Sequence, residues 1–228
     1  GFRLGVTEDW RSRWYSDKDY AKNLENDLAI RSYLDKQLAH AAVSRVEIER
    51  AGDKIKVIIT TSRPGVVIGK KGAEVDALRK KLNQIANGPV SVEVVEVKRP
   101  ELDASLIAQS VAEQLENRVA FRRAMRKAVQ SARKSGAKGI RIQCAGRLGG
   151  AEMSRREWYR EGSVPLHTLR AKIDYGFATA ATTMGSIGIQ VWVYHGEVLP
   201  GQKAPQPALE GSSRPNRSRR RNNDRGDK

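Results

Sequence analysis

The stretch that decides the fold runs Arg63-Pro-Gly-Val-Val-Ile-Gly-Lys-Lys-Gly72, and an apolar-faced helical pattern follows it at once. Two glycines flank two lysines, and glycine lacks the Cβ that would keep a phosphate backbone away from the main chain. The helix expected after Gly72 presents free N–H groups and the positive end of its dipole, which favour an anion. The sequence therefore predicts a phosphate-binding loop made of Gly69, Lys70, Lys71 and Gly72, although this four-residue pattern alone is common in unrelated proteins.

The segments around this loop predict the order helix, strand, strand, helix, helix, strand. A helix is expected from about Asp27 to Ala41, and alternating apolar residues predict a two-stranded hairpin over residues 46–59. A short apolar helical turn at 66–68 precedes the loop, a longer helix follows it, and a strand is expected over 90–94. This order resembles a KH domain of the type II topology, which uses such a loop to hold single-stranded nucleic acid by its backbone.

A second domain is expected after Pro100. Two helices come first, at about Leu102–Arg118 and Phe121–Lys134. Four strand-like stretches follow, at Gly139–Cys144, Met153–Tyr159, Leu169–Tyr175 and Gly188–Tyr194. The small-residue run Ala178–Gly188 is interpreted as a link between the last two strands.

The predicted fold class is α+β, with two domains that each consist of a sheet covered by helices. The expected boundaries are an N-terminal extension at 1–25, a type II KH domain (α-β-β-α-α-β) at 26–99, a two-layer α/β domain at 100–199 and a disordered basic tail at 200–228. The tail has too few apolar residues to offset its ordering entropy by burial.

Charge points to the class of partner. The 228 residues include 42 Lys and Arg against 26 Asp and Glu, a net charge of +16, while 39% of the residues are hydrophobic. Such an excess on a folding chain indicates a polyanion, with nucleic acid as the first candidate and an anionic membrane surface as a distant second. No apolar run approaches the roughly 18 residues of a membrane span, so no membrane partner is expected, and the first residues predict no secretory signal.

The helix expected at Phe121–Lys134 carries its cations in two columns. Arg122, Arg126 and Arg133 form one column, and Arg123, Lys127 and Lys134 form the other, opposite an apolar side. A merely solvated face, which is the alternative, normally mixes charge signs to gain i,i+4 pairs. Six cations without an acid on the helix repel one another unless a polyanion neutralises them. The pattern predicts an RNA-binding helix with Arg122, Arg123, Arg126 and Lys127 as contacts.

A third group of cations is interleaved with aromatic residues. Its candidate RNA-binding residues are Arg147, Arg155, Arg156, Arg160 and Arg170. Arginine suits RNA because its planar fork binds phosphate and stacks on bases. Trp158 and Tyr159 are adjacent, so in a strand they face opposite sides. One of them is expected in the core and the other is free to stack, and the sequence leaves open which.

The sequence carries no pattern for catalysis, a cofactor or a metal. It has no phosphate loop of the G-x-x-x-x-G-K-[ST] type. His40, His167 and His195 are scattered, and the single cysteine, Cys144, fits a small core residue that forms neither an internal disulfide nor a zinc site. The carboxylates at 152–161 and 174 are interpreted as surface or ion-pair residues. We therefore expect a protein that is not an enzyme and takes no small-molecule substrate.

Several motifs together resemble the bacterial S-three family of small-subunit ribosomal proteins, the uS-three family. They are Gly1-Phe-Arg-Leu-Gly5, Arg63–Gly72, Phe121-Arg-Arg-Ala-Met125, Gly146-Arg-Leu-Gly-Gly-Ala-Glu152, Glu157-Trp-Tyr-Arg-Glu-Gly162, Val164-Pro-Leu-His-Thr-Leu-Arg170 and Val191-Trp-Val-Tyr. The resemblance covers about Gly1 to Gly201, and the tail matches only in being basic.

The resemblance implies a cytoplasmic, ribosome-bound protein on the head of the small subunit. It implies binding to small-subunit (16S-type) rRNA, contacts with neighbouring small-subunit proteins, and a position beside the channel through which mRNA enters. It also implies that Arg122, Arg123 and Arg126 hold or unwind incoming mRNA.

Two other functions stay open at this point. A KH-bearing RNA-processing enzyme or GTPase outside the ribosome would need a nucleotide loop or an acidic metal cluster, and the sequence displays neither. A regulatory DNA-binding protein would need a helix with mixed base-reading residues, whereas the most basic helix here is uniformly cationic.

Overall fold

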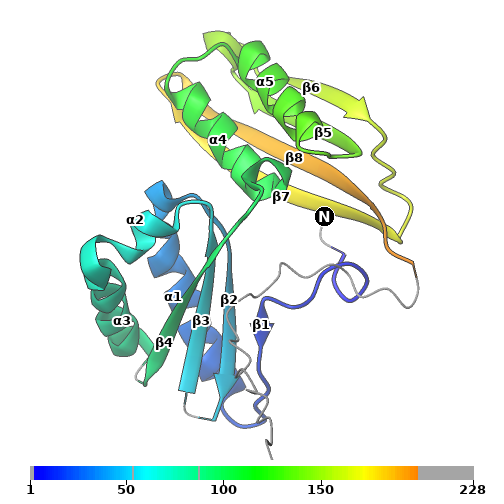
Figure 1. Cartoon of the computed structure of the whole chain (residues 1–228). Coiled ribbons are helices and arrows are strands. Elements are labelled where there is room, and N and C mark those ends of the chain that lie inside the picture. Colours follow the sequence, from blue (N-terminus) through cyan, green and yellow to red (C-terminus); the bar gives the residue numbers. More distant parts are fainter. Residues whose placement is uncertain (1–2, 53, 87, 200–228) are drawn as a thin grey trace, which may run out of the picture.

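The chain folds into two α+β domains, each with a four-stranded sheet that carries helices on one face (Figure 1). The structure is a computed structural model, and it describes residues 3–52, 54–86 and 88–199. The tail expected at 200–228 lies outside the described residues.

The first domain has the element order that the sequence predicts. Its sheet runs β1-β2-β3-β4, with the bounds β1 Ser12–Arg13, β2 Val43–Ala51, β3 Lys54–Thr61 and β4 Val90–Glu96. Its helices are α1 Tyr20–Gln37, α2 Pro64–Ile68 and α3 Ala73–Ala86. Because β4 pairs with β3 in parallel, the chain must cross back between them, and α2 and α3 form that crossover. The core between sheet and helices includes Ile30, Leu34, Ile48, Ile59 and Leu82, all fully buried.

The first helix begins at Tyr20, earlier than the predicted Asp27. Apolar periodicity starts only with Ile30, so the pattern gave no signal for the first two turns. Aromatic packing holds them instead: the rings of Trp14 and Tyr20 lie 5.3 Å apart, and the Trp14 indole donates a hydrogen bond of 2.7 Å to the buried carboxylate of Asp27. Arg50 on β2 pairs with the same carboxylate at 2.5 Å, so this buried charge is compensated.

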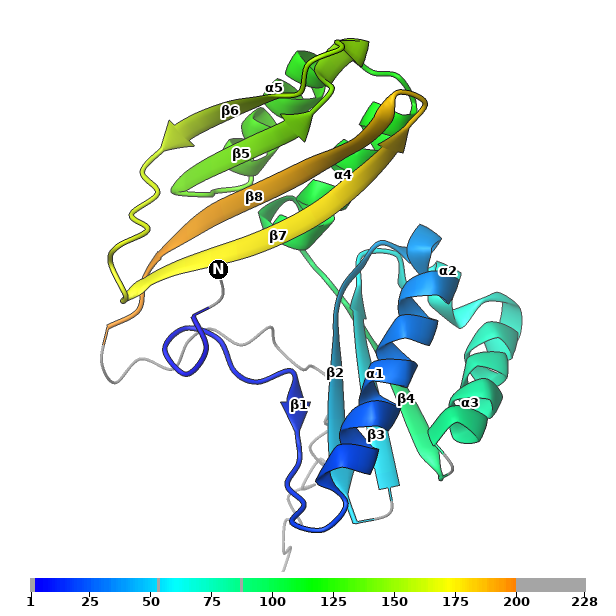
Figure 2. The ribbon, with the colours of Figure 1, turned by 180° about the vertical axis from the view of Figure 1, so that it is seen from behind.

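The second domain packs two helices on an antiparallel sheet. The helices are α4 Ala104–Glu116 and α5 Phe121–Lys134. The strands are β5 Gly139–Gly146, β6 Arg155–Gly162, β7 Ala171–Thr182 and β8 Gly185–Glu197, in the spatial order β6-β5-β8-β7. Both helices lie on the same face (Figure 1), and the view from behind shows the other face without a helix (Figure 2). Apolar side chains from alternate strand positions fill the layer beneath the helices.

The predicted link at Ala178–Gly188 is wrong. These residues continue β7 and β8 almost to the hairpin turn, with Ala178 paired to Ile189 and Thr182 to Gly185. Small residues are needed in β7 because α4 packs closely on this strand. A Cβ at Gly176 would collide with the backbone of Ala104, and Ala180 is fully buried in the same layer.

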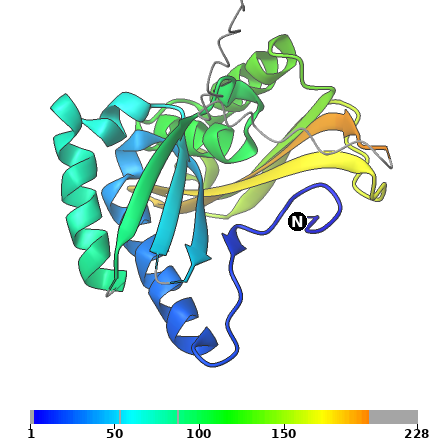
Figure 3. The ribbon, with the colours of Figure 1, turned by 60° about the horizontal axis from the view of Figure 1, so that its bottom comes forward.

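The N-terminal segment joins the two domains (Figure 3). Its strand β1 pairs in parallel with β2 of the first domain. The guanidinium of Arg3 donates hydrogen bonds to backbone carbonyls of the second domain, at Leu166 (2.5 Å), Ala171 (2.7 Å) and Thr168. A hydrogen bond also crosses the junction, because Gln109 on α4 donates to the carbonyl of Val43 at 2.9 Å.

Candidate nucleic-acid interface

The glycine-flanked loop connects α2 to α3, as the sequence predicts. Gly69 has φ 68° and Gly72 has φ 82°. Residues other than glycine rarely adopt such positive φ values. The N–H of Gly69 donates to the carbonyl of Gly65 at 3.0 Å and ends α2. Lys70 is exposed, and the side chain of Lys71 lies outside the described part of the chain. At Gly72 the position of a Cβ is open space among the described residues, so a phosphate backbone has room to approach the main chain there.

An acidic side chain lies against this loop. A Cβ placed on Gly69 would collide with Cγ of Glu74, so the Glu74 side chain packs directly over the glycine. A shallow depression beside the loop is lined by Gly65, Val66, Gly69, Lys70, Ala73 and Glu74. The carboxylate of Glu74 favours the start of α3, but it also repels a phosphate in the depression.

The cationic helix α5 has the two faces that the sequence predicts. Ala124, Met125, Val129 and Ala132 are buried against the sheet, and all six cations are exposed. Arg123, Lys127 and Lys134 form a column for which no ion pair exists among the residues that the structure describes. We call Arg123, Lys127 and Lys134 the open column.

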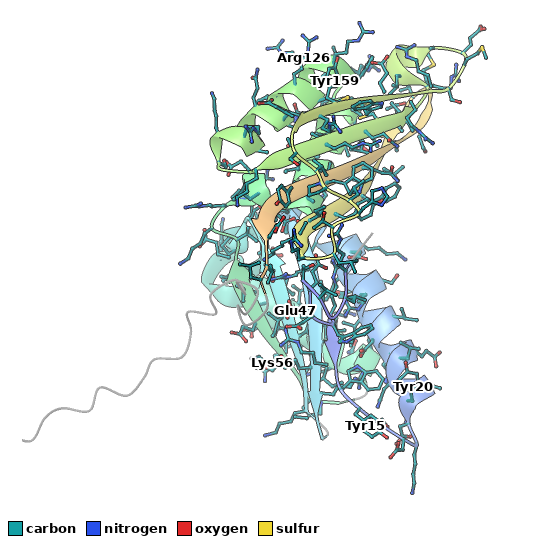
Figure 4. All side chains as sticks on the ribbon, turned by 90° about the vertical axis from the view of Figure 1, so that its right-hand side faces the viewer. Tyr15, Tyr20, Glu47, Lys56, Arg126 and Tyr159 are labelled. Carbon is teal, nitrogen blue, oxygen red and sulfur yellow. The ribbon has the colours of Figure 1, made fainter. Side chains whose placement is uncertain are left out.

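The helix carries no acid of its own, as the sequence shows, but two cations of the neighbouring column pair with acids from another element. Arg122 Nε lies 3.7 Å from Glu157 Oε2, and Arg133 Nε lies 3.4 Å from Glu161 Oε1. Both carboxylates come from β6, the strand beside α5, so helix periodicity alone could not reveal them. Arg126 completes this column with its guanidinium 5.8 Å from the ring centroid of Tyr159 (Figure 4).

The predicted third group of arginines does not form one cluster. Arg147 donates to the carbonyls of Ala151 (2.8 Å) and Met184 (3.1 Å) and so holds two turns together. Arg170 pairs with Glu197 at 2.6 Å, and Arg155 pairs with Glu157 at 2.9 Å beside α5. Along β6, the side chains of Arg156 and Arg160 point to the side opposite Arg155 and Glu157, and both are exposed. Only Arg156 and Arg160 of this group lie on the helix-free side of the sheet.

The structure decides between the two adjacent aromatic residues. Tyr159 packs against the core on the helix side, whereas Trp158 is 54% exposed on the opposite side. The sequence patterns considered above did not reveal the residues that share this face with Trp158, namely Arg141, Gln143, Tyr175, Gln190 and Trp192. Period-two alternation along β5, β7 and β8 is the signal that places them on the same face.

The described residues include neither a metal-binding cluster nor a helix that could span a membrane. No group of three or more His, Cys, Asp or Glu in the described ranges is placed to hold a metal ion. No helix in those ranges combines the length and apolarity that spanning a membrane requires. Cys144 is fully buried, and burial, aided by the nearby Glu157, raises the pKa of its thiol to about 12.

The fold and the loop define the class of this molecule: it is a two-domain α+β protein with a KH domain. The family model described as "KH domain" matches residues 29–102, and the model described as "Ribosomal protein S3, C-terminal domain" matches residues 111–193.

Full-length relatives identify the family. "Small ribosomal subunit protein uS3" of Geobacter sulfurreducens is 62% identical over 203 residues, which cover 89% of this chain and 96% of that protein. The proteins with the same name from Trichlorobacter lovleyi and Syntrophus aciditrophicus are 62% and 59% identical and also cover 89% of this chain, with 96% and 94% of their own lengths. The chain belongs to the small ribosomal subunit protein uS3 family.

Proposed function

We propose that this chain is a non-enzymatic structural constituent of the small ribosomal subunit. In this role it binds small-subunit rRNA in the head, contacts neighbouring small-subunit proteins, and holds mRNA on α5 where the message enters. Family membership, with relatives named for the small subunit, supports the ribosomal part of the proposal. The net charge of +16 supports RNA as the partner.

The open column on α5 is the observation that carries the mRNA contact. Its three cations project from a helix whose other side is buried in the core, so their positions are fixed by the fold rather than by the RNA. The 14-residue helix is about 21 Å long. Guanidinium and ammonium groups along that length can pair with successive phosphates of one strand.

A held strand can favour the opening of a structured message without ATP. The cations bind phosphates and read no base edges, so the strand can slide while its phosphates remain neutralised. Translocation supplies the pulling force, and the helix keeps one strand of a hairpin from pairing again. Arg122 and Arg126 extend the contact, with Arg122 shared between the RNA and Glu157.

Sedimentation tests the ribosomal assignment. A tagged chain expressed in bacteria should migrate with small subunits on a sucrose gradient. A chain that stays at the top of the gradient, bound to other RNA, would support a KH-bearing processing or regulatory protein instead.

Translation tests the role of α5. Ribosomes that carry Arg122→Ala, Arg123→Ala and Arg126→Ala together should translate unstructured messages normally and slow at a stable downstream hairpin. Folding should be spared because alanine is the better helix former. The matched control replaces three exposed lysines of the first domain, Lys18, Lys22 and Lys36, and changes the net charge equally. Equal passage through the hairpin by the parent and the α5 variant would reduce the helix to an rRNA anchor.

A further inference from the structure

One face of the second sheet carries no helix (Figure 2). Strand register places an ordered grid of aromatic, arginine and glutamine side chains on that face. Strand register places them in two rows that cross all four strands. One row is Arg160, Arg141, Trp192 and Tyr175, and the other is Trp158, Gln143, Gln190 and Phe177. We call these eight residues the platform. It contains two arginines and no carboxylate.

Contacts within the platform fix its centre. The guanidinium carbon of Arg141 lies 5.4 Å from the ring centroid of Trp158 and 5.0 Å from that of Trp192, so the cation sits between two indoles. Such cation–π contacts orient the rings without burying them fully. The Trp192 and Tyr175 rings continue the row at 5.5 Å.

The second row is held by hydrogen bonds. Gln143 accepts from Arg141 at 3.2 Å and donates to Gln190 at 3.0 Å, and Gln190 donates to the Tyr175 hydroxyl at 3.3 Å. Trp158 and Phe177 lie at the two ends of this row and are 54% and 58% exposed. The platform thus presents two exposed rings, and hydrogen bonds and cation–π contacts hold its centre in position before any ligand binds.

A cavity of about 350 Å³ adjoins the platform. It is lined by Arg141, Arg160, Val164, Pro165, Leu166, His167 and Thr168. Arg3 holds its outer wall, since it donates to the carbonyls of Leu166 and Thr168. Nε of Arg141 is buried and has no hydrogen-bond partner among the described residues. Two guanidinium groups and an imidazole therefore border a recess beside the exposed Trp158 ring.

We propose that the platform binds unpaired nucleotides of RNA: a base stacks on Trp158 and its phosphate lies at Arg160 and Arg141 beside the cavity. The inference rests on the proposed function, because it takes RNA as the partner. Unpaired bases are required because a base in a duplex has no free face, and base–aromatic stacking is the usual way that open sheets hold single strands. Arginines without a nearby carboxylate in the platform favour a polyanion over an apolar protein surface.

Paired variants test the platform in the full chain. Trp158→Leu removes the stacking ring, and Trp10→Leu is the matched control because Trp10 is 65% exposed and lies outside the platform. We expect Trp158→Leu to weaken binding of a fluorescent single-stranded oligoadenylate of about ten nucleotides by at least about fivefold. Binding of a duplex of the same length should be unchanged, since the cations remain. Trp158→Phe, which keeps a ring, should restore most of the single-strand affinity.

Photocrosslinking locates the contact. An oligouridylate that contains 5-iodouridine should form an adduct on the tryptic peptide Glu157–Arg160, at Trp158 and not at Tyr159, which faces the core. Circular dichroism checks that each variant is folded. If Trp158→Leu does not fold, Phe177→Ser probes the other exposed end of the platform with the same oligonucleotide.

The outcomes separate this inference from the proposed function. Single-strand affinity that is equal in the parent, Trp158→Leu and Phe177→Ser, with adducts only on α5 or the KH loop, would overturn the platform while leaving the ribosomal role intact. Loss of binding to a small-subunit protein in Trp158→Leu, with RNA binding unchanged, would also overturn it and make this face a protein-docking surface. A chain that never sediments with small subunits would instead contradict the proposed function.

Discussion

Arg122 on α5 and Glu157 on β6 form an ion pair across the helix–sheet boundary, with Nε 3.7 Å from Oε2. The same carboxylate accepts from Arg155 through its other oxygen at 2.9 Å. Arg123, one residue further along the helix, has no ion pair in the described ranges. Two adjacent arginines of one motif therefore differ in how much positive charge they can offer to RNA.

Single alanine variants should expose this difference. Arg123→Ala should reduce the salt slope of RNA binding by about 0.7 to 0.9, the change expected for one lost phosphate contact on a single strand or a duplex. Arg122→Ala should reduce it less, because Glu157 already neutralises part of that charge. Filter binding over a range of salt concentrations measures both slopes. A larger effect for Arg122→Ala would mean that RNA displaces Glu157 from the pair.

Gly69 should tolerate no side chain. Gly69→Ala forces a left-handed φ on alanine and drives its Cβ into Glu74, so unfolding free energy should fall by at least about 1–2 kcal/mol. Gly65→Ala is the control, since no atom lies within 4 Å of a Cβ there and the residue is helical. Urea denaturation should show Gly65→Ala as stable as the parent or more so. Equal losses in both variants would contradict the geometry of the loop.

Glu74 should limit the affinity of the KH loop for RNA. Glu74→Gln keeps the methylene packing on Gly69 and removes the charge that repels a phosphate, so single-strand binding should strengthen. Asp76→Asn makes the same charge change in the same helical turn, at a residue that does not line the depression beside the loop. Competition binding with a short single-stranded RNA compares the two, and an equal gain from both would point to general electrostatics.

The Cys144 thiol should be inert in the native protein. It is fully buried, and its raised pKa of about 12 keeps it protonated at neutral pH, whereas the thiolate is the reactive form. A thiol reagent such as dithionitrobenzoate should react only after denaturant is added. Stoichiometric reaction at neutral pH without denaturant would show that the second sheet opens readily.

Acidification should stabilise the junction between the domains through Asp103. Burial first, and then repulsion from Asp174, raise the pKa of Asp103. The folded state therefore takes up a proton at higher pH than the unfolded chain, whose value is near 3.9. The free energy of unfolding should therefore rise as the pH falls from neutral toward that value. Below it both states are protonated at Asp103, so this residue causes no further change with pH.

Asp103→Asn isolates this contribution. Asparagine can still cap α4, where Asp103 accepts from the N–H of Leu106 at 3.1 Å. Denaturation at pH 7 and pH 5 should show that the parent gains stability relative to the variant at the lower pH. An unchanged difference between parent and variant would mean that Asp103 does not titrate in this window.

Local patterns determined most of the secondary structure and the candidate loop, but not the first two turns of α1 or the strands at 178–188. Within residues 63–72 two glycines lie between two helices, and both have the positive φ that a backbone clamp needs. Apolar spacing determined the buried side of α5, because a helix repeats every 3.6 residues whatever surrounds it. These features depend on neighbours in sequence, which the chain itself displays.

The tertiary structure decided what lies opposite each charge and ring. Glu157 and Glu161 reach α5 from β6, and no helical period can reveal a partner that comes from another strand. The register of β5, β6 and β8 put Arg141 between Trp158 and Trp192, residues 17 to 51 positions away along the chain. Strand pairing brings distant residues within contact distance, and pairing depends on how the whole domain packs. The sequence thus determined which groups could bind RNA, and the packing of the domain decided which of them are free to do so.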